Sequence, residues 1–153
     1  MFNKILVGFD GSDQSKRALQ HALVLAEKFN SDLIILTVYQ IPVLPTFSSE
    51  DEGEGEVTDL EFQEQYWDSV KERYANVLRS AEQIVNKDWP SVKYTSLLVE
   101  GRPSTEIMSA AQRNEVDLII LGSRGIGGVT GWILGSTAKS VLDHCKRPVF
   151  IIK

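Results

Sequence analysis

Five short apolar runs, separated by longer amphipathic segments, constrain the fold of this chain more than any other feature. The runs are rich in Val, Ile and Leu and are bounded by Gly, Asp or Pro, which indicates strands buried on both faces. They lie at residues 4–10, 32–39, 93–99, 116–122 and 148–153. Alternating strands and helices imply a parallel sheet, because each return crossover needs a helix. We therefore expect an α/β fold with a five-stranded parallel sheet and helices on both faces.

The segments between the runs predict helices with one packed face. Apolar residues from Trp67 to Val85 recur at helical spacing, and Ala138, Val141, Leu142 and Cys145 share one face of a last helix that begins near Ser136. Residues 42–58 instead combine prolines, serines and an acidic run with glycines, which indicates an exposed acidic loop. At 153 residues the chain has the length of one domain, so we expect a single domain over residues 1–153.

Charge and cysteine content exclude several partners and settings. The formal net charge is −5, so the chain has no electrostatic basis for sequence-independent binding to nucleic acid or for binding to an anionic membrane surface. Cys145 is the single cysteine, and the first residues show no secretory leader. No apolar run approaches the roughly 20 residues that span a bilayer. We expect a cytoplasmic protein, with no metal site at His21 or His144 because neither has a second ligand at suitable spacing.

A glycine-rich stretch, GSRGIGGVTGWILGSTAKS at residues 122–140, follows the fourth apolar run and precedes the last predicted helix. Glycines between a strand and a helix expose backbone N–H groups, and a helix N-terminus adds free donors and partial positive charge, so this arrangement predicts a phosphate site. The spacing matches neither a P-loop nor a dinucleotide fingerprint. Three readings stay open: the glycines could form a plain surface loop, Asp10 could cap the following helix, and Arg124 could be a solvated charge.

The glycine spacing also carries a family resemblance. Gly122-x-x-Gly125, nine residues and then Gly135-Ser136 resembles the motif of the ATP-binding type of universal stress proteins. The resemblance covers the whole chain, from KILVGFDGS through VDLIILGSRG to RPVFII. It implies a Rossmann-like or flavodoxin-like sheet of strand order 3-2-1-4-5, with ATP, or ADP or AMP, bound at the ends of the first and fourth strands.

The resemblance also implies a set of nucleotide-binding residues. Asp10 would contact the ribose, Val38 the adenine through its backbone, and the glycine-rich stretch the ribose and phosphates. The residues concerned are Asp10, Val38, Gly122, Arg124, Gly125, Gly135, Ser136 and Thr137. A Mg or Mn ion would be held mainly by the phosphates. A homodimer is expected through the last strand, Val149–Ile152.

Three functions remain after these observations. The first is a homodimeric ATP-binding module that acts through an unknown protein partner in stress responses. The second is a slow ATPase using the same site, although fast hydrolysis would need a positioned base and charge clamps that the chain does not offer, so no catalytic residue is assigned. The third is an interaction protein with a non-functional pocket.

Overall fold

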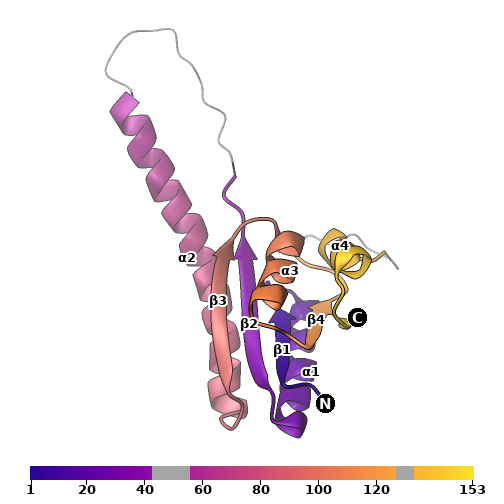
Figure 1. Ribbon diagram of the computed structural model, residues 1–153. Helices are drawn as coiled ribbons and strands as arrows, with labels where there is room; N and C mark the ends of the chain where they lie inside the picture. Colours follow the sequence, from indigo (N-terminus) through magenta and orange to yellow (C-terminus); the bar gives the residue numbers. More distant parts are fainter. Residues whose placement is uncertain (43–55, 127–132) are drawn as a thin grey trace.

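The computed structural model describes residues 1–42, 56–126 and 133–153. Strands and helices alternate along the chain, as the apolar runs predict (Figure 1). The strands are β1 (Lys4–Gly8), β2 (Asp32–Tyr39), β3 (Tyr94–Glu100), β4 (Leu118–Gly122) and β5 (Val149–Ile152). The helices are α1 (Asp13–Phe29), α2 (Glu56–Asp88), α3 (Pro103–Arg113) and α4 (Ser136–His144).

The strands form one parallel sheet in the order β3-β2-β1-β4-β5, which confirms the expected order. β1 lies at the centre, with Ile5 paired to Leu33 of β2 and to Leu118 of β4. The chain therefore winds outward in one direction from β1 through β2 to β3, and in the other through β4 to β5. The winding reverses between β1 and β4, which is the place where ligands bind in open parallel sheets.

Alternate side chains of the strands fill two separate cores. Ile5, Val7 and Leu118 pack with α1 and α2 on one face of the sheet. Leu6 and Ile119, from the same two strands, pack under α3 and α4 on the other face. Because successive strand residues point to opposite faces, a continuous apolar run satisfies both cores. The expectation of helices on both faces is therefore confirmed.

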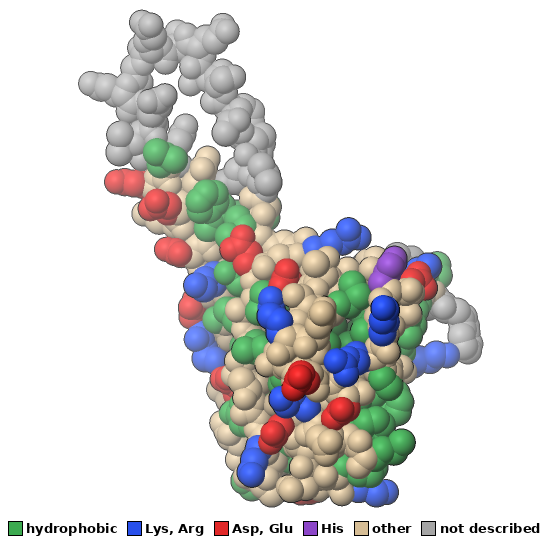
Figure 2. Space-filling model, in the orientation of Figure 1, with side chains coloured by type: hydrophobic (Ala, Val, Ile, Leu, Met, Phe, Trp, Pro, Cys, Tyr) green, Lys and Arg blue, Asp and Glu red, His purple; other side chains and the backbone are tan. Residues whose placement is uncertain are grey.

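The helix α2 is longer than the sheet it covers. Its 33 residues correspond to about 50 Å at 1.5 Å per residue, and it runs past the carboxyl end of the sheet (Figure 1). Hydrophobic and acidic side chains cover this projecting part (Figure 2). The packed face begins at Val70, so the prediction that Trp67 is buried is wrong: this turn lies beyond the strands, and Trp67 is 36% exposed.

The boundaries of two predicted segments also need correction. The helix α2 begins at Glu56, so the acidic loop predicted at residues 42–58 ends earlier; residues 43–55 of that loop lie outside the described residues. In α4, Ala138 and Val141 are buried as predicted, but Leu142 is 43% exposed. The reason is that α4 lies at the edge of the sheet, over β5 and beside α3, so only a narrow stripe is covered. Among the described residues, none of the helices combines the length and apolar character that crossing a bilayer requires.

Candidate functional site

A cavity of about 670 Å³ opens at the carboxyl end of the sheet, where β1, β2 and β4 end. Its volume lies in the range of small-molecule sites, about 300–1,000 Å³. All eight residues predicted to bind a ligand line it: Asp10, Val38, Gly122, Arg124, Gly125, Gly135, Ser136 and Thr137. The structure therefore brings together residues that are up to 127 positions apart in the chain, at the point where the winding of the sheet reverses.

The carboxylate of Asp10 joins two loops at the mouth of this cavity. Its Oδ1 accepts the N–H of Ser12 at 2.9 Å, and its Oδ2 accepts the N–H of Ile126 at 3.1 Å. The helix α1 is capped by Ser12, whose hydroxyl oxygen accepts the N–H of Ser15 at 3.2 Å. Asp10 is therefore not the N-cap of α1. It holds the loop after β1 against the loop after β4.

The motif glycines permit close contacts with the loop after β1, the start of α1 and the loop after β4. A Cβ atom at Gly122 would lie 2.8 Å from the carbonyl carbon of Gln14 in α1, and one at Gly125 would lie 2.6 Å from Oδ2 of Asp10. A Cβ atom at Gly135 would lie 3.1 Å from the carbonyl oxygen of Ser123. The sequence suggested only that glycines keep a phosphate path clear. The structure adds a packing reason for each of the three, which depends on distances that the sequence does not give.

The N-terminus of α4 faces the cavity. Gly135 is the N-cap residue, with an extended backbone, and it provides no side-chain hydrogen bond to the helix. Its N–H donates to the carbonyl oxygen of Ser123 at 2.7 Å, which fixes the helix start against the loop after β4. The first N–H groups of a helix have no partner within the helix. Together with the hydroxyls of Ser136 and Thr137, they offer hydrogen-bond donors to an anion in the cavity.

The end of β2 offers backbone groups to the same cavity. The N–H of Phe9 donates to the carbonyl oxygen of Leu36 at 2.8 Å, so Leu36 points its polar groups toward β1. Because strand residues alternate, Val38 points its N–H and C=O to the same side, beyond Gly8, where β1 ends. The buried hydroxyl of Thr37 donates to the carbonyl oxygen of Phe9 at 2.8 Å and holds the chain that leaves β1.

Tyr74 and Lys139 are among the cavity-wall residues that the sequence reasoning did not assign to the site. Tyr74 reaches the cavity from α2, and its ring centroid lies 6.1 Å from that of Tyr39 with a tilt of 33°. The sequence marked it only as part of an apolar helical face. Lys139 lines the cavity from the first turn of α4, and the sequence analysis assigned it no role.

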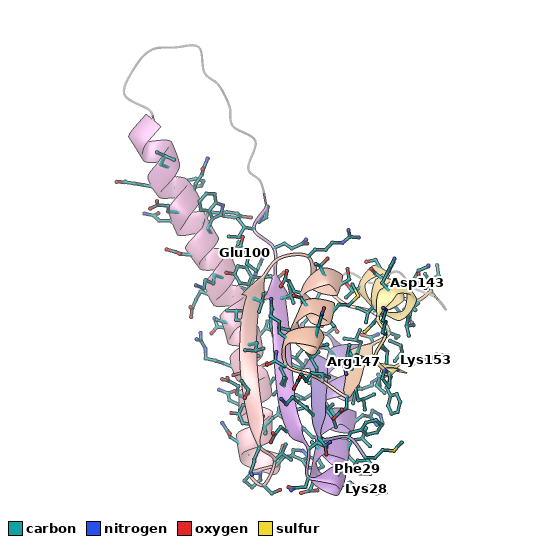
Figure 3. The ribbon with its side chains drawn as sticks, viewed as in Figure 1. Lys28, Phe29, Glu100, Asp143, Arg147 and Lys153 are labelled. Carbon is teal, nitrogen blue, oxygen red and sulfur yellow. The ribbon has the colours of Figure 1, made fainter. Side chains whose placement is uncertain are left out.

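Lys139 forms an ion pair on the surface of α4. Its Nζ donates to Oδ2 of Asp143 at 2.8 Å, and the two side chains are 67% and 51% exposed. This hydrogen bond and the opposite charge raise the pKa of Lys139 and lower the pKa of Asp143. Both groups are therefore charged at neutral pH. Figure 3 labels Asp143 on α4.

The part of the cavity wall that the structure describes does not gather protein ligands for a metal ion. Among the described residues, no group of three or more His, Cys, Asp or Glu side chains is placed to hold a metal. Asp10, the carboxylate of the cavity wall, already accepts two backbone N–H groups. A cation here would need most of its ligands from a bound molecule.

Comparisons with known proteins agree with this architecture. Residues 1–153 match the family model described as "Universal stress protein family". The chain is 34% identical over 158 residues to the universal stress protein YxiE of Bacillus subtilis, and the match covers 100% of both chains. The solved structure of MJ0577 of Methanocaldococcus jannaschii superposes with a TM-score of 0.80 at 25% identity, over 100% of this chain and 96% of that one.

Two further solved structures share the fold at lower identity. One is a universal stress protein in complex with cAMP, with a TM-score of 0.65 at 24% identity, over 99% of this chain and 95% of that one. The other is a universal stress protein from Archaeoglobus fulgidus in complex with dAMP, with a TM-score of 0.61 at 21% identity, over 98% and 97% of the two chains. At these identities the likeness is one of fold.

Proposed function

The chain belongs to the universal stress protein family, and from that premise we propose that it binds an adenine nucleotide, ATP in the first place, in the cavity at the end of the sheet. The observation that carries the proposal is the convergence of all eight motif residues on one cavity of about 670 Å³. Fold relatives in complex with cAMP and with dAMP support an adenine ligand.

The polar groups of the cavity suggest how the nucleotide lies. The backbone N–H and C=O of Val38 suit the hydrogen-bonding edge of adenine, and the carboxylate of Asp10 suits ribose hydroxyls. The phosphates then lie along Gly125 and Arg124 toward Ser136 and the N-terminus of α4, where donors and partial positive charge favour an anion. A Mg or Mn ion would be held mainly by phosphate oxygens, since these are the oxygen ligands that such ions prefer.

Calorimetric titration of nucleotide-stripped protein with Mg-ATP tests the proposal, with chromatography of the recovered nucleotide. We expect a Kd near 1 μM, which is about 8 kcal/mol, and recovery of ATP rather than ADP. Replacing both Ser136 and Thr137, as Ser136→Ala with Thr137→Val, should weaken binding about tenfold through lost hydrogen bonds to charged oxygens. Ser140→Ala is the matched control on the same helix, outside the cavity wall.

Each outcome of this titration selects among the three functions. Binding with intact ATP supports a binding module, whereas rapid conversion to ADP supports the ATPase. Absence of binding in two independent assays would leave an interaction protein with a non-functional pocket. Equal affinity of the double variant and the Ser140→Ala control would place the phosphates elsewhere.

We also propose that the protein acts as a cytoplasmic homodimer that pairs through β5 and passes its nucleotide state to a protein partner in stress responses. β5 is an edge strand, and Phe150 on it is 42% exposed. The carbonyl oxygens of Pro148 and Ile152 accept the N–H groups of Ile119 in β4 and of Ser123 just after it. By alternation, Val149 and Ile151 direct their N–H and C=O groups outward, where a second copy of β5 can pair with them.

Sedimentation of two variants tests the dimer. Phe150→Glu places a charge on the proposed interface and should give a monomer. Phe62→Glu makes the same change at an aromatic residue that is 66% exposed on α2, and it should leave the dimer intact. A dimer in Phe150→Glu, or a monomer in Phe62→Glu alone, would contradict pairing through β5.

A further inference from the structure

The helix α4 differs from α1 and α3 in the charges of its first turn. The N-terminus of a helix favours negative charge and its C-terminus favours positive charge. The helix α1 follows this rule, with Asp13 in its first turn and Lys28 in its last; Lys16 also lies in the first turn, where it pairs with Asp13. The helix α3 follows it as well, with Glu106 and Arg113. In α4, the last turn holds the basic residue His144, but the first turn contains Lys139 and no acidic residue.

The ion pair on α4 makes this arrangement more unusual. Asp143 lies in the last turn, where a negative charge is disfavoured, and the order Lys139 before Asp143 is the weaker order for a pair four residues apart on a helix. Both side chains are more than half exposed, so solvent screens their attraction. The stability of α4 therefore does not account for a lysine at this position. Residues that break a local rule without stabilising the fold are expected at functional sites.

The cavity supplies the missing reason. Lys139 lines it, one helical turn beyond the N-cap residue Gly135, whose carbonyl oxygen accepts the N–H of Lys139 at 2.9 Å. Residues four apart share one face of a helix, so Lys139 lies on the same face of α4 as Gly135. Its ammonium group can swing between Asp143 and an anion at the helix N-terminus. An anion near Gly135 would therefore meet both the charge of Lys139 and the partial positive charge at the N-terminus of α4.

We propose that Lys139 is a specificity-determining residue that contacts the terminal phosphates of a nucleoside triphosphate, and that Asp143 holds the lysine when no triphosphate is present. The inference rests on the proposed nucleotide site and adds to it a preference for ATP over AMP. A flexible, compact ammonium group suits this task, since it can reach a phosphate oxygen as a point charge without a fixed geometry. Adenosine and its first phosphate are held by other residues, so their binding does not depend on Lys139.

The test compares four nucleotide-stripped proteins: the wild type, Lys139→Gln, Asp143→Asn and Lys146→Gln. Lys146→Gln is the charge-matched control, because Lys146 is exposed beyond the C-terminus of α4 and does not line the cavity. Calorimetry gives the Kd of each for ATP and for AMP, with magnesium and with a chelator. We expect Lys139→Gln to weaken ATP binding about five- to tenfold, the effect of a partly exposed hydrogen bond to a charged group, and to leave AMP within about twofold.

The other variants sharpen the expectation. Asp143→Asn releases the lysine and should strengthen ATP binding about two- to fivefold, the range of an exposed ion pair, with AMP unchanged. Lys146→Gln should match the wild type for both nucleotides. Thermal unfolding supplies a second readout: Lys139→Gln should melt at nearly the same temperature as the wild type, because the exposed pair with Asp143 adds little stability, whereas replacing a lysine with a structural role would clearly lower the melting temperature.

The results separate the inference from the function it rests on. Failure of the wild type to bind either nucleotide would overturn both. A wild type that binds ATP and AMP, together with a Lys139→Gln variant whose ratio of the two Kd values is unchanged, would overturn the role of Lys139 alone. An equal loss of ATP affinity in Lys146→Gln would also overturn it, because the effect would then be one of general charge.

Discussion

Replacing Gly122 with alanine tests whether close packing between β4 and α1 fixes the position of the site. The new methyl group would lie 2.8 Å from the carbonyl carbon and from Cβ of Gln14, and 3.0 Å from the backbone nitrogen of Ser15. These atoms belong to the first turn of α1, which Ser12 caps, so a change of rotamer cannot relieve the clash. Overpacking of this kind costs about 1–3 kcal/mol, and the upper half of the range applies when both sides are backbone.

One effect acts in the opposite direction. Alanine restricts the unfolded chain more than glycine, which stabilises a protein by about 0.4–1 kcal/mol where the native backbone is compatible. The φ angle of Gly122 lies outside the left-handed region, so this gain applies. The net loss of unfolding free energy is therefore about 1–2.5 kcal/mol, which lowers the melting temperature by about 2–10 °C for a chain of this size.

Thermal and urea unfolding followed by circular dichroism measure this loss. Gly125→Ala is the matched control, because its methyl group meets a side-chain oxygen, Oδ2 of Asp10, at 2.6 Å. That carboxylate can move at the cost of its hydrogen bond to Ile126, about 0.5–1.5 kcal/mol. A Gly122→Ala protein as stable as the wild type, or more stable than Gly125→Ala, would refute the packing argument.

Three further predictions concern stability. Thr37→Val should lower the unfolding free energy by about 1–3 kcal/mol, since a buried main-chain carbonyl loses its hydroxyl donor; an unchanged urea midpoint would contradict this. Asp10→Asn should cost about 1–2 kcal/mol, because the amide keeps one acceptor oxygen and loses one of the two bonds from backbone N–H groups, whereas Asp13→Asn, at an exposed site, should cost little. Because Lys139 lowers the pKa of Asp143, the weak stabilisation from that pair is fully present above the ordinary pKa of an aspartate, about 3.9, and is lost as the pH falls through the lower pKa of the folded protein. Both groups are exposed, so the acid unfolding midpoint of Asp143→Asn should differ from the wild type only slightly, and least at high salt.

Hydrophobic periodicity predicted most of the fold, because alternating strands and helices leave few ways to bury both faces of a sheet. The strand order came from the family resemblance: no periodicity says that β1 neighbours β4 as well as β2. The sequence predicted burial least well near the ends of helices. Trp67 and Leu142 both continue an apolar helical face in the sequence. Trp67 is exposed because it lies beyond the end of the sheet, and Leu142 is exposed because α4 lies at the edge of the sheet, where only a narrow stripe of the helix is covered.

The candidate site was predicted as a set of residues but not as a geometry. Glycine spacing predicted a phosphate site, and the family resemblance added Asp10 and Val38 and placed all eight residues at the ends of the first and fourth strands. The contact of Gly122 with α1 and the two N–H groups on Asp10 could not be predicted, because both depend on distances between segments far apart in the chain. Lys139 was overlooked because a charge on a helix surface carries no signal until its neighbours in space are known.

The most direct test of the central claim is an NMR titration of the ¹⁵N-labelled protein with Mg-ATP, read as backbone amide shifts. Binding as proposed should shift the amides of Asp10, Val38 and residues 122–126 and 135–139. It should leave unchanged those at the opposite end of the sheet, where the strands begin, such as Phe29 at the end of α1 (Figure 3). Shifts confined to other surfaces, or no shifts at millimolar ATP, would contradict the account.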